Sequence, residues 1–144
     1  MSVFTPGEIE YLTRTTMGRL ATVGRDGQPH VMPMSYRYNP DEDTIDIGGI
    51  DFGNSKKWRD VQHNQRVTFL VDDASPQGAH AVEIRAIAEL HETGGETINP
   101  RFPQFKPQFI RLRAHYVVSW GVDPQSDGSK EGFKPYGRRV GPGL

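Results

Sequence analysis

The sequence predicts a small, mostly β protein: an antiparallel barrel of about six strands with short helices. Six β-compatible runs recur at short spacing with turn residues between them. Sixteen glycines and eleven prolines supply the tight turns that such a chain requires. The connections are too short for the crossover helices of a parallel sheet, so the strands are expected to be antiparallel.

A short helix is expected within residues 1–17. Thr5 is a good N-cap, Pro6 fits the first turn, and Glu8 stands three positions after the cap. Ile9 and Leu12 then fall on one face. Gly18 is expected to end this helix.

The barrel is expected to occupy residues 18–122, and the whole chain, 1–144, is expected to be a single domain. Its first strands form a hairpin, residues 20–23 and 30–38, and a third strand covers 44–47. Pro33 has no N–H for a ladder, so it is expected at an edge, at a bulge or beside a ligand.

A helix near residue 56 leads into a strand at residues 66–71. Strict alternation over residues 82–90 predicts a strand with one buried face. Residues 109–122 are expected to form the last strand, or two strands with a break near residues 113–115. Apolar residues are sparse from 123 to 144, so this tail is expected to be loop or to be ordered only by packing on something else.

Composition excludes several classes of function. The formal net charge of −1 argues against a nucleic-acid partner, and no apolar run is long enough to span a membrane. There is no signal-peptide pattern and no cysteine, which favours a cytoplasmic location and excludes thiol and disulfide chemistry. The five histidines have no metal-ligand spacing. No nucleophile elbow or P-loop is present, so no catalytic side chain is assigned.

Two lysines stand at the start of the middle helix, after an N-cap at Asn54 or Ser55. Lys56 and Lys57 lie where the helix dipole disfavours cations. Two solvated surface lysines would cost little there. Alternatively, the N–H groups, the hydroxyl and the ammonium groups form a cradle for a phosphate.

Other features suit a flat aromatic ligand. Gly48 and Gly49 at a strand end permit close approach to a ring, and Met32, Pro33 and Met34 offer soft contacts. Trp58 and Trp120 are either core residues or further aromatic surface. Together with the lysines, these residues indicate a phosphorylated aromatic cofactor that would carry the reactive atom.

Three motifs, GRLATV, DGQPHVMPM and SKKWRDVQHNQRVTFLVDD, resemble the split β-barrel flavin-binding proteins of the pyridoxamine 5′-phosphate oxidase superfamily. The last strand, FIRLRAHYVVSWG, is similar to the small actinobacterial members, many of which use the deazaflavin coenzyme F-420 in place of FMN. The resemblance covers residues 18–122. It implies a six-stranded split barrel that dimerises with itself and holds cofactor sites at the interface.

The resemblance also implies roles for individual residues. Ser55, Lys56 and Lys57, next to Asn54, would grip the phosphate; Met32, Pro33, Met34 and Ser35 would run beside the ring. Gly48 and Gly49 would lie near the ring and its tail, and Trp120 and Gly121 would come from the second subunit. Candidate cations for an F-420 polyglutamate tail are Arg59, Arg101, Lys106, Arg138 and Arg139.

The expected function is therefore a redox enzyme. Reduced F-420 or FMN would pass a hydride to a conjugated organic acceptor, with water or Tyr36 as proton donor. The second strand carries no arginine before Arg37, which departs from the oxidase itself, so vitamin B6 is not the expected substrate. The alternative is a non-catalytic protein that binds or carries a flavin, F-420 or a haem-derived ligand, and a third is a barrel that only assembles with a partner.

Overall fold

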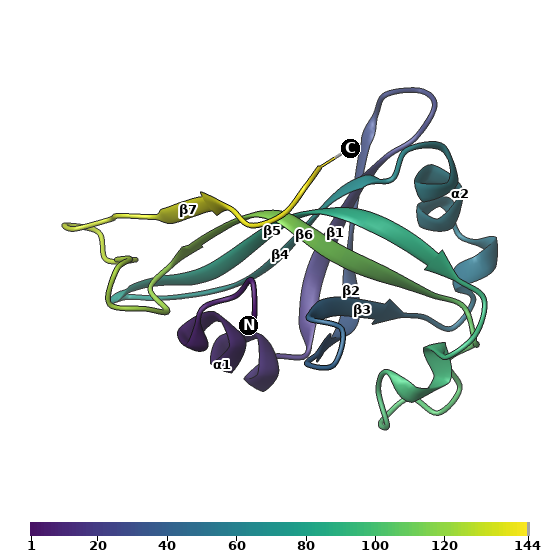
Figure 1. Cartoon of the computed structure of the whole chain (residues 1–144), viewed down its shortest axis with the longest axis horizontal. Helices are drawn as coiled ribbons and strands as arrows, with labels where there is room; N and C mark the ends of the chain where they lie inside the picture. The colour runs from purple at the N-terminus through teal and green to yellow at the C-terminus, as the bar shows by residue number, and fades with distance from the viewer. Residues whose placement is uncertain (144) are drawn as a thin grey trace.

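A computed structural model describes residues 1–143 of the chain as one seven-stranded antiparallel sheet and two α-helices (Figure 1). The strand order is β3-β2-β1-β4-β5-β6-β7, and a pairing between β3 and β6 closes the first six strands into a barrel. This confirms the predicted six-stranded barrel. In chain order the elements are α1 (Pro6–Arg14), β1 (Met17–Val23), β2 (Pro29–Asn39), β3 (Thr44–Gly48), η1 (Phe52–Asn54), α2 (Lys56–His63), β4 (Arg66–Ser75), β5 (Gly78–His91), η2 (Gly95–Thr97), β6 (Phe109–Trp120) and β7 (Tyr136–Arg139).

The barrel interior is filled by alternate residues of the strands. On β5, Val82, Ile84, Ala86 and Ala88 are fully buried, as the alternation predicts. The pairing of β5 with β6 shifts register between Arg85 and Ala86, which marks a bulge in this long hairpin. No helix within residues 1–143 combines the length and the apolar character that crossing a bilayer requires.

Helix α1 begins as predicted and ends earlier than predicted. Thr5 and Glu8 form a full capping box, but the helix stops at Arg14, and Gly18 lies inside β1. The expectation that Gly18 ends the helix is wrong. A Cβ at Gly18 would lie 2.3 Å from the Phe69 ring, so a core aromatic residue, rather than a helix terminus, requires the glycine.

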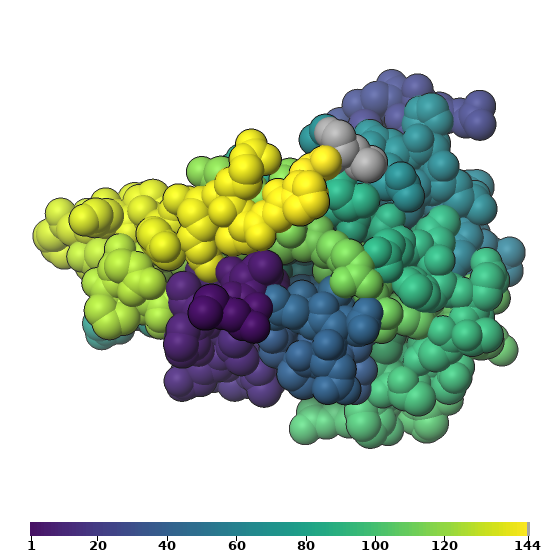
Figure 2. Space-filling model, viewed as in Figure 1, coloured from purple at the N-terminus to yellow at the C-terminus, as the bar shows by residue number. Residues whose placement is uncertain are grey.

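The C-terminal tail is not all loop. Residues 136–139 form β7, which adds to the free edge of β6. Of the two expectations for the tail, loop is therefore wrong there, and order through packing on another element describes these residues. Arg138 of β7 donates two hydrogen bonds to the buried carboxylate of Glu8, at 2.7 and 2.6 Å. Figure 2 shows the tail, in yellow, lying directly against the N-terminal segment, in purple.

Candidate functional site

Strand β2 has one open edge beside the predicted ring-binding residues. It pairs with β3 over residues 36–39, whereas in the described chain residues 29–35 pair with β1 alone. The β1–β2 hairpin projects from the barrel beyond this point (Figure 1). Pro33 lies in the open stretch, where its missing N–H costs the sheet little. The free backbone groups of this edge are available to hydrogen-bond a ligand.

The side chains of that stretch differ in exposure. Met32 is 40% exposed and Val31 60% exposed, which is high for apolar residues. Met34 points into the core instead, and the Ser35 hydroxyl lies 3.4 Å from the Met17 sulfur. A ligand at this edge would therefore meet only the backbone of Met34, but the side chain of Met32 as well.

Gly48 and Gly49 pack against the protein's own chain. A Cβ at Gly48 would lie 2.9 Å from the Phe105 ring, and the Gly49 carbonyl accepts a hydrogen bond from the Lys106 amide at 3.1 Å. The close approach that glycine allows at Gly48 is therefore made by Phe105. These contacts fix the segment after η2 beside the end of β3.

Ser55 is the N-cap of α2. Its hydroxyl accepts a hydrogen bond from the Trp58 amide at 3.2 Å and donates to the Phe52 carbonyl at 2.7 Å. Asn54 precedes it in η1 and donates to the Asp51 carboxylate at 3.0 Å. The hydroxyl thus anchors η1 to α2 and sets the direction of the first-turn N–H groups.

The two lysines at the start of α2 have different surroundings. Lys56 forms an ion pair with Asp60, four positions on, at 2.9 Å, and Asp60 also accepts a hydrogen bond from Thr22. Lys57 has no carboxylate partner within residues 1–143, and its ammonium lies 5.8 Å from the centre of the Phe52 ring. Burial lowers the pKa of Lys57. Of the two lysines, Lys57 is thus the one whose charge no carboxylate of the described chain compensates.

A small pocket of about 280 Å³ lies beside η1 and the start of α2. Asn54 and Lys106 line it, together with the carboxylates of Asp51 and Glu92. Trp58 also borders it but is 4% exposed and packs on Phe52, with ring centroids 5.9 Å apart. Trp58 is therefore mainly a core residue.

Trp120 and Gly121 lie far from the lysines. Trp120 ends β6 and Gly121 follows it, where the chain turns toward the tail, and this end of β6 is opposite to α2 in Figure 1. Trp120 makes an edge-on contact with Phe133, with ring centroids 5.7 Å apart, and Gly121 has a φ of 76°. One chain does not bring these two residues together with Ser55, Lys56 and Lys57.

Tyr36 is tied into the core. It is 4% exposed and its hydroxyl donates to the Leu12 carbonyl at 2.7 Å. Burial raises the pKa of Tyr36 to about 12. Its proton is committed to this internal bond, so Tyr36 is a poor donor to a substrate.

The tail-cation candidates are also separated by the structure. Arg138 is committed to Glu8, and Arg59 donates to the Asn54 carbonyl. Arg101 and Lys106 lie on the segment after η2 and are exposed. Within the described chain no group of three His, Cys, Asp or Glu residues could hold a metal ion.

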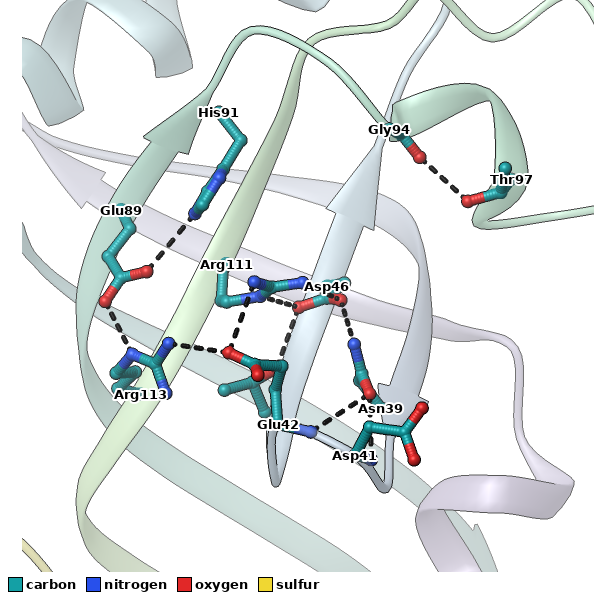
Figure 3. Close-up of polar contacts among 11 residues, drawn as sticks. Asn39, Asp41, Glu42, Asp46, Glu89, His91, Gly94, Thr97, Arg111 and Arg113 are labelled. Atoms are coloured by element: carbon teal, nitrogen blue, oxygen red, sulfur yellow. Dashed lines mark hydrogen bonds and ion pairs between the residues drawn. The ribbon is translucent and has the colours of Figure 1, made fainter.

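A network of ion pairs, which the sequence analysis missed, covers the outside of β3 and β6 (Figure 3). Arg111 binds both carboxylate oxygens of Asp46, at 3.0 and 3.1 Å, and Asn39 and Thr44 each donate a further bond at 2.9 Å. Burial alone would raise the pKa of Asp46, but these hydrogen bonds hold that pKa below its ordinary value. The alternation of charged and apolar residues in TIDI and IRLR is the signal that could have indicated it.

Comparison with known proteins identifies the family. Residues 6–117 match the family model described as pyridoxamine 5′-phosphate oxidase. This chain therefore belongs to the pyridoxamine 5′-phosphate oxidase family of split β-barrels.

The relatives agree with this assignment. A protein of Streptomyces rimosus subsp. rimosus, named 5a,11a-dehydrotetracycline/5a,11a-dehydrooxytetracycline reductase, is 41% identical over 123 residues, which is 83% of this chain and 84% of that protein. A conserved hypothetical protein of Mycobacterium tuberculosis has a TM-score of 0.64 at 21% identity, over 90% of this chain and 95% of its own. An FAD-binding protein of Mesorhizobium loti has a TM-score of 0.58 at 22% identity, over 81% of this chain and 93% of its own. The relationship to a named reductase over most of the chain makes this protein an oxidoreductase of the family.

Proposed function

We propose that the protein is a reductase that uses reduced coenzyme F-420, or else FMN, to reduce a conjugated carbon–carbon double bond in a polycyclic enone. The observation that carries the proposal is the 41% identity, over most of both chains, to a reductase named for dehydrotetracyclines. Such acceptors are flat, conjugated and electron-poor. The alternative of a non-catalytic carrier has no comparable support.

The residues of the site fit a phosphorylated cofactor. Lys57 is a half-buried cation without a carboxylate partner in the described chain, at the N-terminal end of α2, where first-turn N–H groups would also favour an anion. The open edge of β2 offers unpaired backbone groups to the ring. Lys56 is held by Asp60, so we assign the main phosphate contact to Lys57.

Hydride transfer is the chemistry that the bound cofactor would supply. The chain itself would bind the phosphate at Lys57, align the ring along residues 32–35 and hold the acceptor above it. Reduction of the double bond would place the hydride on the acceptor's β-carbon, and a proton would have to reach its α-carbon. Because the Tyr36 hydroxyl is committed to Leu12, we assign this proton to water.

We also propose that two copies of the chain share each site. The apolar side chains of Val31 and Met32 are exposed on the open hairpin, as expected of a surface that a partner covers. Trp120 and Gly121 lie too far from Lys57 to meet it within one chain. A second copy would place them there.

The test is a side-by-side titration and turnover assay. Purified protein is titrated with F-420 and with FMN, and each reduced cofactor is then mixed under anaerobic conditions with a dehydrotetracycline. Reoxidation of the cofactor in proportion to reduced product supports the proposal. Tight cofactor binding without turnover on this acceptor or on simpler enones would favour the carrier, and no binding of either cofactor would reject both.

A further inference from the structure

A second pocket is larger than the pocket beside η1 and α2. It measures about 610 Å³ and is bounded by the end of α1, the second half of β2 and residues 98–102. Leu12, Met17, Ile98 and Phe102 give it apolar walls, and Phe102 stacks on Phe105, with ring centroids 5.5 Å apart. This size is within the range of small-molecule sites, and flat apolar ligands suit such walls.

Two arginines supply the charge of this pocket. Arg37 and Arg101 both line it and are exposed. Neither side chain has an ion pair or hydrogen bond among residues 1–143. Of the lining residues that the structure describes, none is Asp or Glu. The lining of the pocket therefore carries two positive charges and no negative charge, whereas the pocket beside α2 includes two carboxylates. Arg37 also borders a neighbouring pocket that includes Asp46 and Arg111.

The free state of Arg37 has a specific cause. Asp46 stands directly opposite Arg37 in the β2–β3 register and would be its natural partner. Its two carboxylate oxygens already accept four hydrogen bonds, two from Arg111 and one each from Asn39 and Thr44 (Figure 3). The Arg37 guanidinium is thus available to pair with an anion from outside the chain.

We propose that this pocket binds the ionised edge of the acceptor, a planar polycyclic enolate or carboxylate, with Arg37 and Arg101 as its anion-binding residues. This rests on the proposed function, because it names how that function would hold its substrate. A guanidinium matches a planar carboxylate or enolate with two parallel hydrogen bonds. Apolar walls beside two such groups fit a flat, amphipathic anion better than a flexible polar tail.

The position of Ser35 connects the pocket to the cofactor site. Ser35 lines the pocket and also belongs to the open edge of β2 that we assign to the ring. An acceptor anchored at Arg37, two positions further along the strand, would extend toward that edge. The pocket would thus set the orientation of the acceptor relative to the hydride donor, and it would favour anionic acceptors over neutral ones.

The test uses two probes of the same shape, anthraquinone carboxylate and its neutral hydroxymethyl analogue, titrated into the full chain by calorimetry. We expect the wild type to bind the carboxylate about tenfold more tightly or better, as one charge-assisted contact implies. The double variant Arg37→Gln with Arg101→Gln should bind both probes equally. Arg25→Gln is the matched control, because Arg25 is exposed and does not line the pocket.

Further readouts separate this proposal from the proposed function. Replacement of both arginines by lysine should keep part of the preference for the carboxylate, and F-420 titration of the glutamine variant should match the wild type. Equal affinity of the two probes for the wild type, no binding of either, or an unchanged preference in the glutamine variant would overturn the assignment. Loss of F-420 affinity in that variant would assign the arginines to the cofactor tail instead. If the wild type binds the carboxylate probe selectively but never reduces an acceptor, the assignment of the pocket holds and the proposed reductase activity is rejected.

Discussion

The ion pair between α1 and β7 yields a sharp stability prediction. Glu8 is fully buried and accepts hydrogen bonds from Arg138 at 2.7 and 2.6 Å, from the Ser119 hydroxyl at 2.6 Å and from the Thr5 amide at 2.9 Å. Arg138→Met would leave a buried carboxylate with half of its donors. Removing one partner of a buried pair costs ~3–5 kcal/mol. Because the Arg138 side chain is 18% exposed, water can replace part of the contact, and we expect about 3 kcal/mol.

Urea unfolding measures this loss as a lower midpoint at constant slope. Arg139→Met is the control, because Arg139 is the next residue of β7, is exposed, and should change stability by less than ~0.5 kcal/mol. Adding Glu8→Gln to Arg138→Met should recover part of the loss by removing the uncompensated charge. If Arg138→Met costs no more than Arg139→Met, the reasoning about the buried pair is refuted.

Three further predictions follow from single contacts. Lys57→Ala should weaken cofactor binding about 10–100-fold in a titration. Lys56→Ala should have a much smaller effect, because Asp60 already pairs with that lysine. Equal effects of the two substitutions would contradict the assignment of the main phosphate contact to Lys57. Gly128→Ala should lower the melting temperature, because its Cβ would lie 1.7 Å from the Ala79 carbonyl oxygen; an unchanged melting temperature would show that the tail can shift freely. Because the pKa of Asp46 is lowered in the folded state, its contribution to stability is present above its ordinary pKa and is lost as the pH falls through the lowered value. Asp46→Asn should therefore flatten the acid limb of the stability profile, and an identical limb would contradict that.

The fold was largely predictable because its signals are local. Strand alternation, turn residues and the capping box at Thr5 depend on residues a few positions apart, and they predict the six barrel strands and both helices. The prediction for Gly18 was wrong because a glycine after a helix usually indicates a C-cap. Here the glycine is required by the Phe69 ring, which leaves no room for a Cβ. β7 could not be predicted, because the buried partner of Arg138 is 130 positions away in the chain.

The site was less predictable than the fold. The spacing of Lys56 and Asp60, four positions apart on one helix, could have indicated an internal ion pair and so distinguished the two lysines. That Arg37 has no ion-pair partner in the described chain could not be predicted from the sequence. It depends on how Arg111, Asn39 and Thr44 share the Asp46 carboxylate. Such competition for one partner is a property of the folded surface.

The open edge of β2 unites these observations. An unpaired strand edge with exposed apolar residues promotes aggregation, and the chain retains one at residues 29–35, which include the exposed Val31 and Met32. Pro33 removes one donor from that edge and so reduces its capacity to pair with a foreign strand. An edge that is protected in this way, and that the chain itself leaves unpaired, suits a flat ligand, which needs a few free backbone groups and not a continuous ladder. The same strand then runs on to Arg37 and the positive pocket, so one segment would align both reactants of a hydride transfer.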